Sequence, residues 1–113
     1  MKDGIYNARV EKANLWFEDH GCLCFDLEFV HQGGHQSFGG INLMSQFTKK
    51  FERTGGNVAG WYIKRVFDIC GAERYDDLKG KTVRVKIEDG IIKAIGNIIL
   101  DDWFEPRVDF AEK

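Results

Sequence analysis

The stretch Leu23-Cys24-Phe25-Asp26-Leu27-Glu28-Phe29 alternates large apolar side chains with cysteine or acidic ones. A period of two places all the apolar side chains on one face of an extended chain, so this stretch predicts a β-strand with one buried face. The preceding Glu18-Asp19-His20-Gly21 has the composition of a tight turn that joins this strand to an earlier one. Such a turn predicts three facing pairs, all directed into the core: Phe17 with Leu23, Leu15 with Phe25, and Ala13 with Leu27.

The earlier strand changes its parity part-way along. Tyr6, Ala8 and Val10 are apolar at even positions, whereas the apolar residues nearer the turn are at odd positions. One extra residue near Glu11-Lys12 would bring both sets onto the same face, so we predict a β-bulge there.

A third strand follows a turn at Gly33-Gly34, which pairs Phe29 with Phe38. Continued without a break, this register would place Asn42 inside the core. A bulge at Gly39-Gly40 corrects it, because glycine tolerates the backbone of a bulge best. The corrected register predicts two further pairs: Leu27 with Ile41, and Phe25 with Leu43.

A last hairpin turns at Asp89-Gly90, a dipeptide typical of two-residue hairpin turns. It predicts three pairs: Ile87 with Ile92, Val85 with Ala94, and Val83 with Gly96.

A helical block lies between the third strand and this hairpin. Ser45 caps a short helix that carries Phe47 and Phe51, and Asn57 can cap the next helix. Gly71 ends that second helix. Apolar residues form a stripe along it at helical spacing: Val58, Tyr62, Val66, Ile69 and Cys70.

Three strands, a helix and a hairpin are the element order of a small oligonucleotide/oligosaccharide-binding (OB) barrel. We therefore expect residues 1–100 to form a mainly β, five-stranded antiparallel barrel with a helix between strands 3 and 4. Residues 101–113 begin with Asp101-Asp102-Trp103-Phe104-Glu105-Pro106. We expect this segment to form a strap, because a strap would cover three isoleucines that are otherwise exposed: Ile91, Ile95 and Ile99. The alternative is a tail that docks a partner through Trp103 and Phe104.

Composition limits the class of protein. The 113 residues suit one domain with a core of its own, and the net charge of −2 does not suit a protein that coats duplex DNA. Three cysteines, an odd number, indicate a reducing compartment. No stretch predicts a signal peptide or a membrane span, so we expect a cytoplasmic protein without a membrane partner.

Metal and catalytic sites are not expected. Cys22 and His31 are about nine residues apart on one strand, roughly 30 Å at about 3.3 Å per residue. His20, Cys22 and Cys24 therefore cannot share an ion with His31 and His35, and Cys-x-Cys is not the spacing of a zinc knuckle. No nucleophile elbow or phosphate loop is present. We expect no enzyme activity, no cofactor and no metal.

Nucleic-acid binding has more support. Trp16 is expected on the outer face, opposite Cys24, among Asn14, Asp26 and Glu28. Single strands are held by aromatic stacking and a cationic groove. The expected cations form a stripe along the outer positions of the strands: Arg9, Lys12, Arg84, Lys86 and Lys93, with Lys81 as an extension. The alternative is an ordinary charged exterior, since Glu11 and Glu88 share this stripe.

A resemblance to small bacteriophage and prophage proteins runs through most of the chain. It lies in Gly4–Ala8, Leu23–Phe29, Ile69–Ala72, Asp77–Val85, Ile95–Ile99 and Trp103–Pro106. These segments resemble phage single-stranded-DNA-binding-like barrels that are grouped as domains of unknown function. The resemblance implies a replication or recombination accessory that binds single-stranded DNA in the host cytoplasm. The alternative is a phage-encoded inhibitor or adaptor that binds a host defence or replication protein, which the acidic pI and the Trp103-Phe104 segment favour. The oligomeric state stays open, with a homodimer as one alternative.

Overall fold

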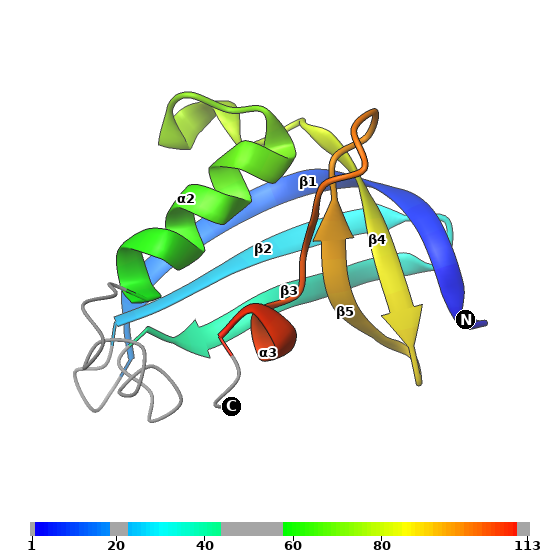
Figure 1. Ribbon diagram of the computed structural model, residues 1–113, viewed down its shortest axis with the longest axis horizontal. Helices are drawn as coiled ribbons and strands as arrows, with labels where there is room; N and C mark the ends of the chain where they lie inside the picture. The colour runs from blue at the N-terminus through cyan, green and yellow to red at the C-terminus, as the bar shows by residue number, and fades with distance from the viewer. Residues whose placement is uncertain (1, 19–22, 44–57, 111–113) are drawn as a thin grey trace.

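The computed structural model describes residues 2–18, 23–43 and 58–110 (Figure 1). Its elements, in chain order, are β1 (Gly4–Phe17), β2 (Leu23–His31), β3 (Gly34–Asn42), α2 (Val58–Cys70), the 3-10 helix η1 (Tyr75–Asp77), β4 (Thr82–Glu88), β5 (Ile91–Gly96), β6 (Trp103–Phe104) and α3 (Pro106–Asp109). None of the helices in the described part of the chain combines the length and the apolar character needed to cross a bilayer.

The strands of the described residues form one antiparallel sheet of six strands in the order β3-β2-β1-β4-β5-β6. The sheet curls into a half-barrel, with β4 and β5 crossing in front of β2 and β3 and with α2 beside them (Figure 1). The side chain of Gln36 on β3 bridges to the β4–β5 turn, where its Nε2 donates to the Gly90 carbonyl at 2.9 Å. The expected count of five strands is wrong, because the segment after β5 returns and adds β6 to the edge of the sheet.

The pairing of β1 with β2 agrees with the predicted register. Phe17, Leu15 and Ala13 face their predicted partners, and the predicted bulge lies between Val10 and Lys12. The predicted inward direction is wrong for Leu15 and Phe17, which are 46% and 72% exposed. The reason is that β4 begins opposite Arg9, so no described strand flanks this end of β1 and its side chains extend past the core.

The β2–β3 register differs from the prediction by two residues. Phe38 faces Leu27 rather than Phe29, because the turn begins after His31 and returns at Gly34. Phe38 is still buried, since a shift of two residues keeps each side chain on its face. The predicted bulge at Gly39-Gly40 is confirmed. The two pairs predicted beyond it are wrong, because Phe25 faces Ile41.

The β4–β5 hairpin contains a bulge that the sequence did not predict. Asp89 and Gly90 have φ values of 54° and 76°, as a two-residue hairpin turn requires, and Ile87 pairs with Ile92 as predicted. The register then shifts by one residue at Lys93. The other two predicted pairs are therefore replaced: Val85 faces Ile95, and Arg84 faces Gly96.

Helix α2 contributes the predicted stripe to the core. Tyr62, Val66, Ile69 and Cys70 are buried, and Gly71 ends the helix with a positive φ of 68°. The expected helix that begins at Ser45 and carries Phe47 and Phe51, together with the expected cap at Asn57, lies outside the described residues.

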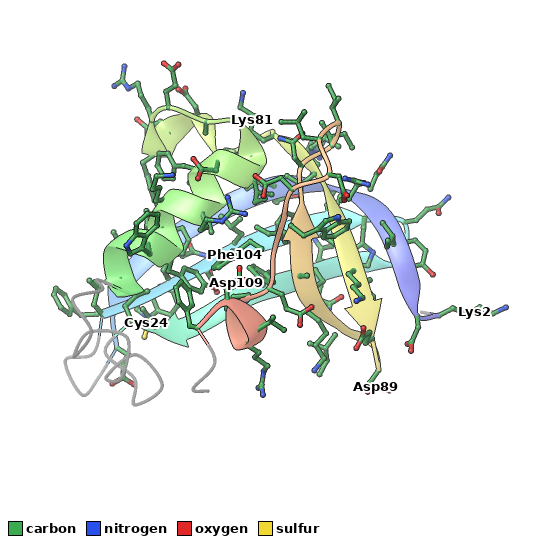
Figure 2. All side chains as sticks on the ribbon, in the orientation of Figure 1. Lys2, Cys24, Lys81, Asp89, Phe104 and Asp109 are labelled. Carbon is green, nitrogen blue, oxygen red and sulfur yellow. The ribbon has the colours of Figure 1, made fainter. Side chains whose placement is uncertain are left out.

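The C-terminal segment packs on the half-barrel as a strap. Phe104 is fully buried inside it (Figure 2), with its ring centroid 5.0 Å from that of Tyr62 and 5.9 Å from that of Phe110. Arg65 of α2 fixes the strap, since its Nη2 lies 2.6 Å from Asp102 Oδ1 and also donates to the Trp103 carbonyl at 3.2 Å. Phe104 pairs with the buried Ile95. Two isoleucines expected beneath the strap stay exposed: Ile91 and Ile99.

Candidate functional site

The outer side of β1 carries the predicted aromatic residue. Trp16 faces Cys24 across the β1–β2 pair, as predicted, and its side chain is 40% exposed. Cys24 was expected on the outer face as well, but it is buried. The bulge in β1 changes the parity of the strand, so Lys12, Asn14 and Trp16 continue the face on which Arg9 lies.

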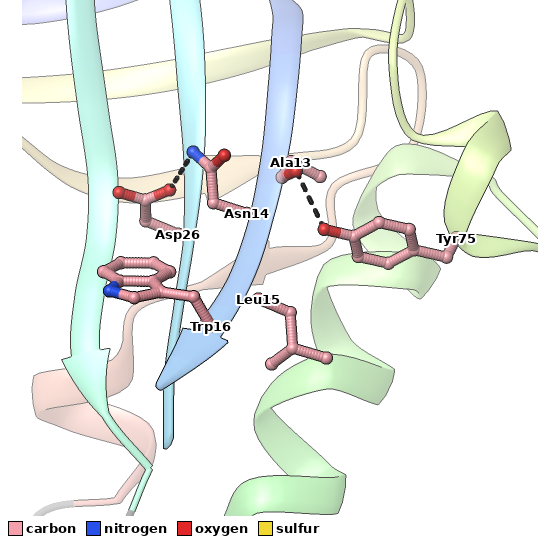
Figure 3. Close-up of a pocket in the computed structure, with 6 residues that line it drawn as sticks. All are labelled: Ala13, Asn14, Leu15, Trp16, Asp26 and Tyr75. Atoms are coloured by element: carbon pink, nitrogen blue, oxygen red, sulfur yellow. Dashed lines mark hydrogen bonds between the residues drawn. The ribbon is translucent and has the colours of Figure 1, made fainter. Parts of the chain in front are cut away.

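An open groove of about 430 Å³ lies beside Trp16. It is lined by Ala13, Asn14, Leu15, Trp16, Asp26 and Tyr75 (Figure 3). Tyr75 comes from η1, and its hydroxyl donates to the Ala13 carbonyl at 2.8 Å, which holds the phenol ring beside the strand. Trp16 and Tyr75 therefore flank the groove from opposite sides of β1 (Figure 3).

The sequence did not predict Tyr75 as part of the site. Its contact with Ala13 joins residues 62 positions apart, and no local pattern near Tyr75 signals this contact. Burial raises the pKa of the Tyr75 phenol, and the nearby Asp26 and Asp76 raise it further. The hydroxyl therefore stays protonated and remains a hydrogen-bond donor to Ala13 at neutral pH.

A side-chain amide joins two carboxylates next to the groove. Asn14 Nδ2 donates to Asp26 Oδ1 at 2.7 Å and to Glu28 Oε2 at 2.6 Å. An amide nitrogen carries two protons, so these two bonds use its full donor capacity. The wall of the groove is thus polar and acidic rather than basic.

The predicted cations do not gather at one point. Arg9 and Lys12 are exposed along β1, and Lys93 is half-buried at the bulge of β5. Lys86 faces Ile5 of β1, and its Nζ lies 3.3 Å from Glu88 Oε1, an exposed ion pair that binds weakly.

Arg84 has a structural role that the sequence did not predict. Its Nε donates to the Asn97 carbonyl and its Nη2 to the Leu100 carbonyl, both at 2.8 Å. Its guanidinium also lies 4.9 Å from the centroid of the Trp103 ring. Arg84 therefore braces the loop between β5 and β6, and the two hydrogen bonds use two of its five N–H donors.

That loop presents an apolar tip. Asn97 holds it from inside, since its Nδ2 donates to the Ile69 carbonyl and its Oδ1 accepts from the amides of Ile99 and Leu100. Ile99 is 85% exposed, and its neighbours Ile98 and Leu100 are exposed as well. Of the two residues expected in a docking tail, Trp103 is half-buried and Phe104 belongs to the core.

The residues considered for metal binding lie only partly within the described part of the chain. Among the described residues, no group of three or more histidine, cysteine or acidic side chains could hold a metal ion. His20 and Cys22 lie outside the described residues. His31 belongs to the β2–β3 turn, where its Nδ1 accepts from the Gly33 amide at 3.0 Å. Burial raises the pKa of the Cys70 thiol to about 12, so this cysteine is not a nucleophile at neutral pH.

A comparison with protein-family models and with curated proteins finds no significant match to this chain. The fold and the groove beside Trp16 are therefore the features that bear on function.

Proposed function

We propose that this protein is a non-catalytic binder of single-stranded nucleic acid, built on an OB-like barrel and encoded by a phage. The observation that carries the proposal is the exposed Trp16, which lies on the outer face of a curled antiparallel sheet and lines the same groove as Tyr75. OB barrels bind oligonucleotides on the outer side of their early strands. The central place of β1 between β2 and β4 supports this assignment.

The bound strand would run along β1. One base stacks on Trp16, because every base offers a flat face to an aromatic ring and the contact needs no particular sequence. Lys12 and Arg9 follow along the strand, and Lys86 lies beyond them. The distance from Trp16 to Arg9 is roughly 23 Å at about 3.3 Å per residue, which accommodates a few nucleotides.

The affinity would depend only moderately on salt. Three cations stay exposed or weakly paired along the track, namely Arg9, Lys12 and Lys86. Three phosphate contacts on a single strand predict a slope of about −2 for the logarithm of the binding constant against the logarithm of salt concentration.

Fluorescence anisotropy with a labelled thirty-base oligothymidine tests the proposal. We expect Trp16→Ala to weaken binding about tenfold, which corresponds to the stacking of one base. Trp61→Ala is the matched control, because Trp61 is also exposed but lies on α2, with Lys64 Nζ 5.5 Å from its ring centroid. Absence of binding at low salt, or equal losses in the two variants, would contradict the proposal.

A second function, binding of a host protein as an inhibitor or adaptor, is favoured by the tip Ile98–Leu100. Consecutive exposed aliphatic side chains are typical of interaction sites. The hydrogen bonds from Arg84 and Asn97 order the loop in advance, which lowers the entropy lost on association.

Capture of host proteins by the tagged chain and by two variants tests this alternative. We expect a partner that is retained by the wild type and by Ile91→Ser, but lost with Ile99→Ser. Ile91 is the matched control, because it is exposed at the β4–β5 turn rather than at the tip. Loss of the partner in both variants would point to a nonspecific apolar contact instead.

A further inference from the structure

The polar side chains that line the groove have their hydrogen-bond donors already engaged. Both amide protons of Asn14 go to carboxylates, and the Tyr75 hydroxyl proton goes to the Ala13 carbonyl. The carboxylate oxygens of Asp26 accept hydrogen bonds and donate none. The indole nitrogen of Trp16 lies on the edge of its ring that is farthest from Tyr75 (Figure 3).

The groove therefore offers acceptors to a ligand. Asn14 keeps its carbonyl oxygen, Tyr75 keeps a lone pair, and Asp26 keeps Oδ2, for which the described residues provide no partner. A ligand that satisfies these atoms must bring N–H groups and few acceptors of its own. It must also offer a flat face to Trp16, which is a diagonal neighbour of Asp26 on the same side of the β1–β2 pair.

We infer that this groove binds one guanine base of a single strand, stacked on Trp16 with its N1–H and N2 amino group donating to the Asp26 carboxylate. This inference rests on the proposed function and gives it a base preference. Guanine presents two adjacent donors on its Watson–Crick edge, which is free in a single strand. Cytosine and adenine present one amino group, and thymine presents one N–H between two carbonyls that the acceptors would repel.

Charge fixes the direction of the nucleotide in the groove. Asp26 in the groove repels phosphate but not a neutral base, so the base enters and the backbone stays outside, towards Lys12, which faces Glu28 across the β1–β2 pair. The volume of about 430 Å³ lies within the range of small-ligand sites, about 300–1,000 Å³.

The test compares oligothymidines that carry a single central guanine, inosine or thymine. We expect guanine to bind about tenfold more tightly than thymine, towards the low end of what a bidentate base contact provides. Inosine lacks the N2 amino group and should fall between them. Asp26→Asn should abolish the preference for guanine, whereas the control Glu28→Gln should keep it, because Glu28 contacts Asn14 without lining the groove.

The possible outcomes separate this inference from the proposed function. If all three oligonucleotides bind equally well and Trp16→Ala still weakens binding, the guanine site is wrong and the general binding function stands. If none of them binds, both are wrong. Competition by arginine amide as strong as that by deoxyguanosine monophosphate would overturn the inference in favour of a peptide ligand. If Asp26→Asn does not fold, the comparison of guanine, inosine and thymine on the wild type decides alone.

Discussion

Tyr62 places a phenolic hydroxyl in the centre of the core. Its ring packs edge-on against Phe25 and Phe104, yet among the described residues its hydroxyl has no hydrogen-bond partner. Burial raises the pKa of this phenol, and the charge of Asp26 raises it further. A Cβ atom on Gly39 would lie 2.7 Å from the hydroxyl, so the bulge of β3 needs glycine beside Tyr62.

We predict that Tyr62→Phe raises the free energy of unfolding by about 1 kcal/mol, because a buried hydroxyl without a partner loses its hydration and gains no hydrogen bond in exchange. Urea denaturation at pH 7 measures the change. Tyr6→Phe is the control, since the Tyr6 hydroxyl is exposed and donates to the Lys2 carbonyl, and it should change stability by less than about 0.5 kcal/mol. A clear loss of stability in Tyr62→Phe would mean that the hydroxyl has a partner.

Single residues differ in how far the sequence predicts their role. The position of Trp16 followed from alternation along β1 and β2, because two strands joined by a short turn share one register. Arg84 was expected to contact phosphate, but it faces a loop whose path depends on the whole C-terminal segment. Contacts of this kind leave no periodic signal in the sequence.

At the scale of elements, the bulges show what alternation can and cannot reveal. The bulge in β1 changes the parity of the apolar residues, so it is visible in the sequence. The bulge at Lys93 is hidden, since Ile91, Ile92, Ala94 and Ile95 are apolar at both parities. The two-residue error in the β2–β3 register is hidden for another reason: such a shift keeps every side chain on its face.

The loop after β5 gives a prediction at the same scale. Asn97→Ala should lower the free energy of unfolding by about 2 kcal/mol, because three hydrogen bonds of its side chain are lost. The amides of Ile99 and Leu100 should then exchange with solvent faster, which hydrogen-exchange mass spectrometry detects. Asn7→Ala, at an exposed site on β1, is the control and should leave this exchange unchanged. Unchanged exchange in Asn97→Ala would mean that Arg84 alone orders the loop.

At the scale of the whole molecule, the strap completes the core. The sequence predicted a mainly β fold with a sheet of alternating strands, but it placed the boundary of the barrel at residue 100. Phe104 and Phe110 are buried in the same cluster as Phe29, Phe38 and Tyr62. A cluster assembled from both ends of the chain depends on tertiary packing, which local patterns do not encode.

We predict that Phe104→Ala lowers the free energy of unfolding by about 3–5 kcal/mol, as expected for removal of a large side chain from a core. Thermal and urea denaturation measure the loss. Val108→Ala, at an exposed position of α3, is the control and should cost less than about 0.5 kcal/mol. A folded protein of nearly unchanged stability in Phe104→Ala would contradict the assignment of the strap to the core.

The central place of β1 also suggests the order in which its two strand pairings form during folding. Its pairing with β2 and the pairing of β2 with β3 join neighbours along the chain, whereas residues 4–9 must find residues 82–87. Closing a long loop costs more entropy than closing a short one and slows the step that depends on it. The meander β1–β2–β3 can therefore nucleate first, with the capture of β4 as a later event. The same strand is then the first to begin its hydrogen bonding and among the last to finish it.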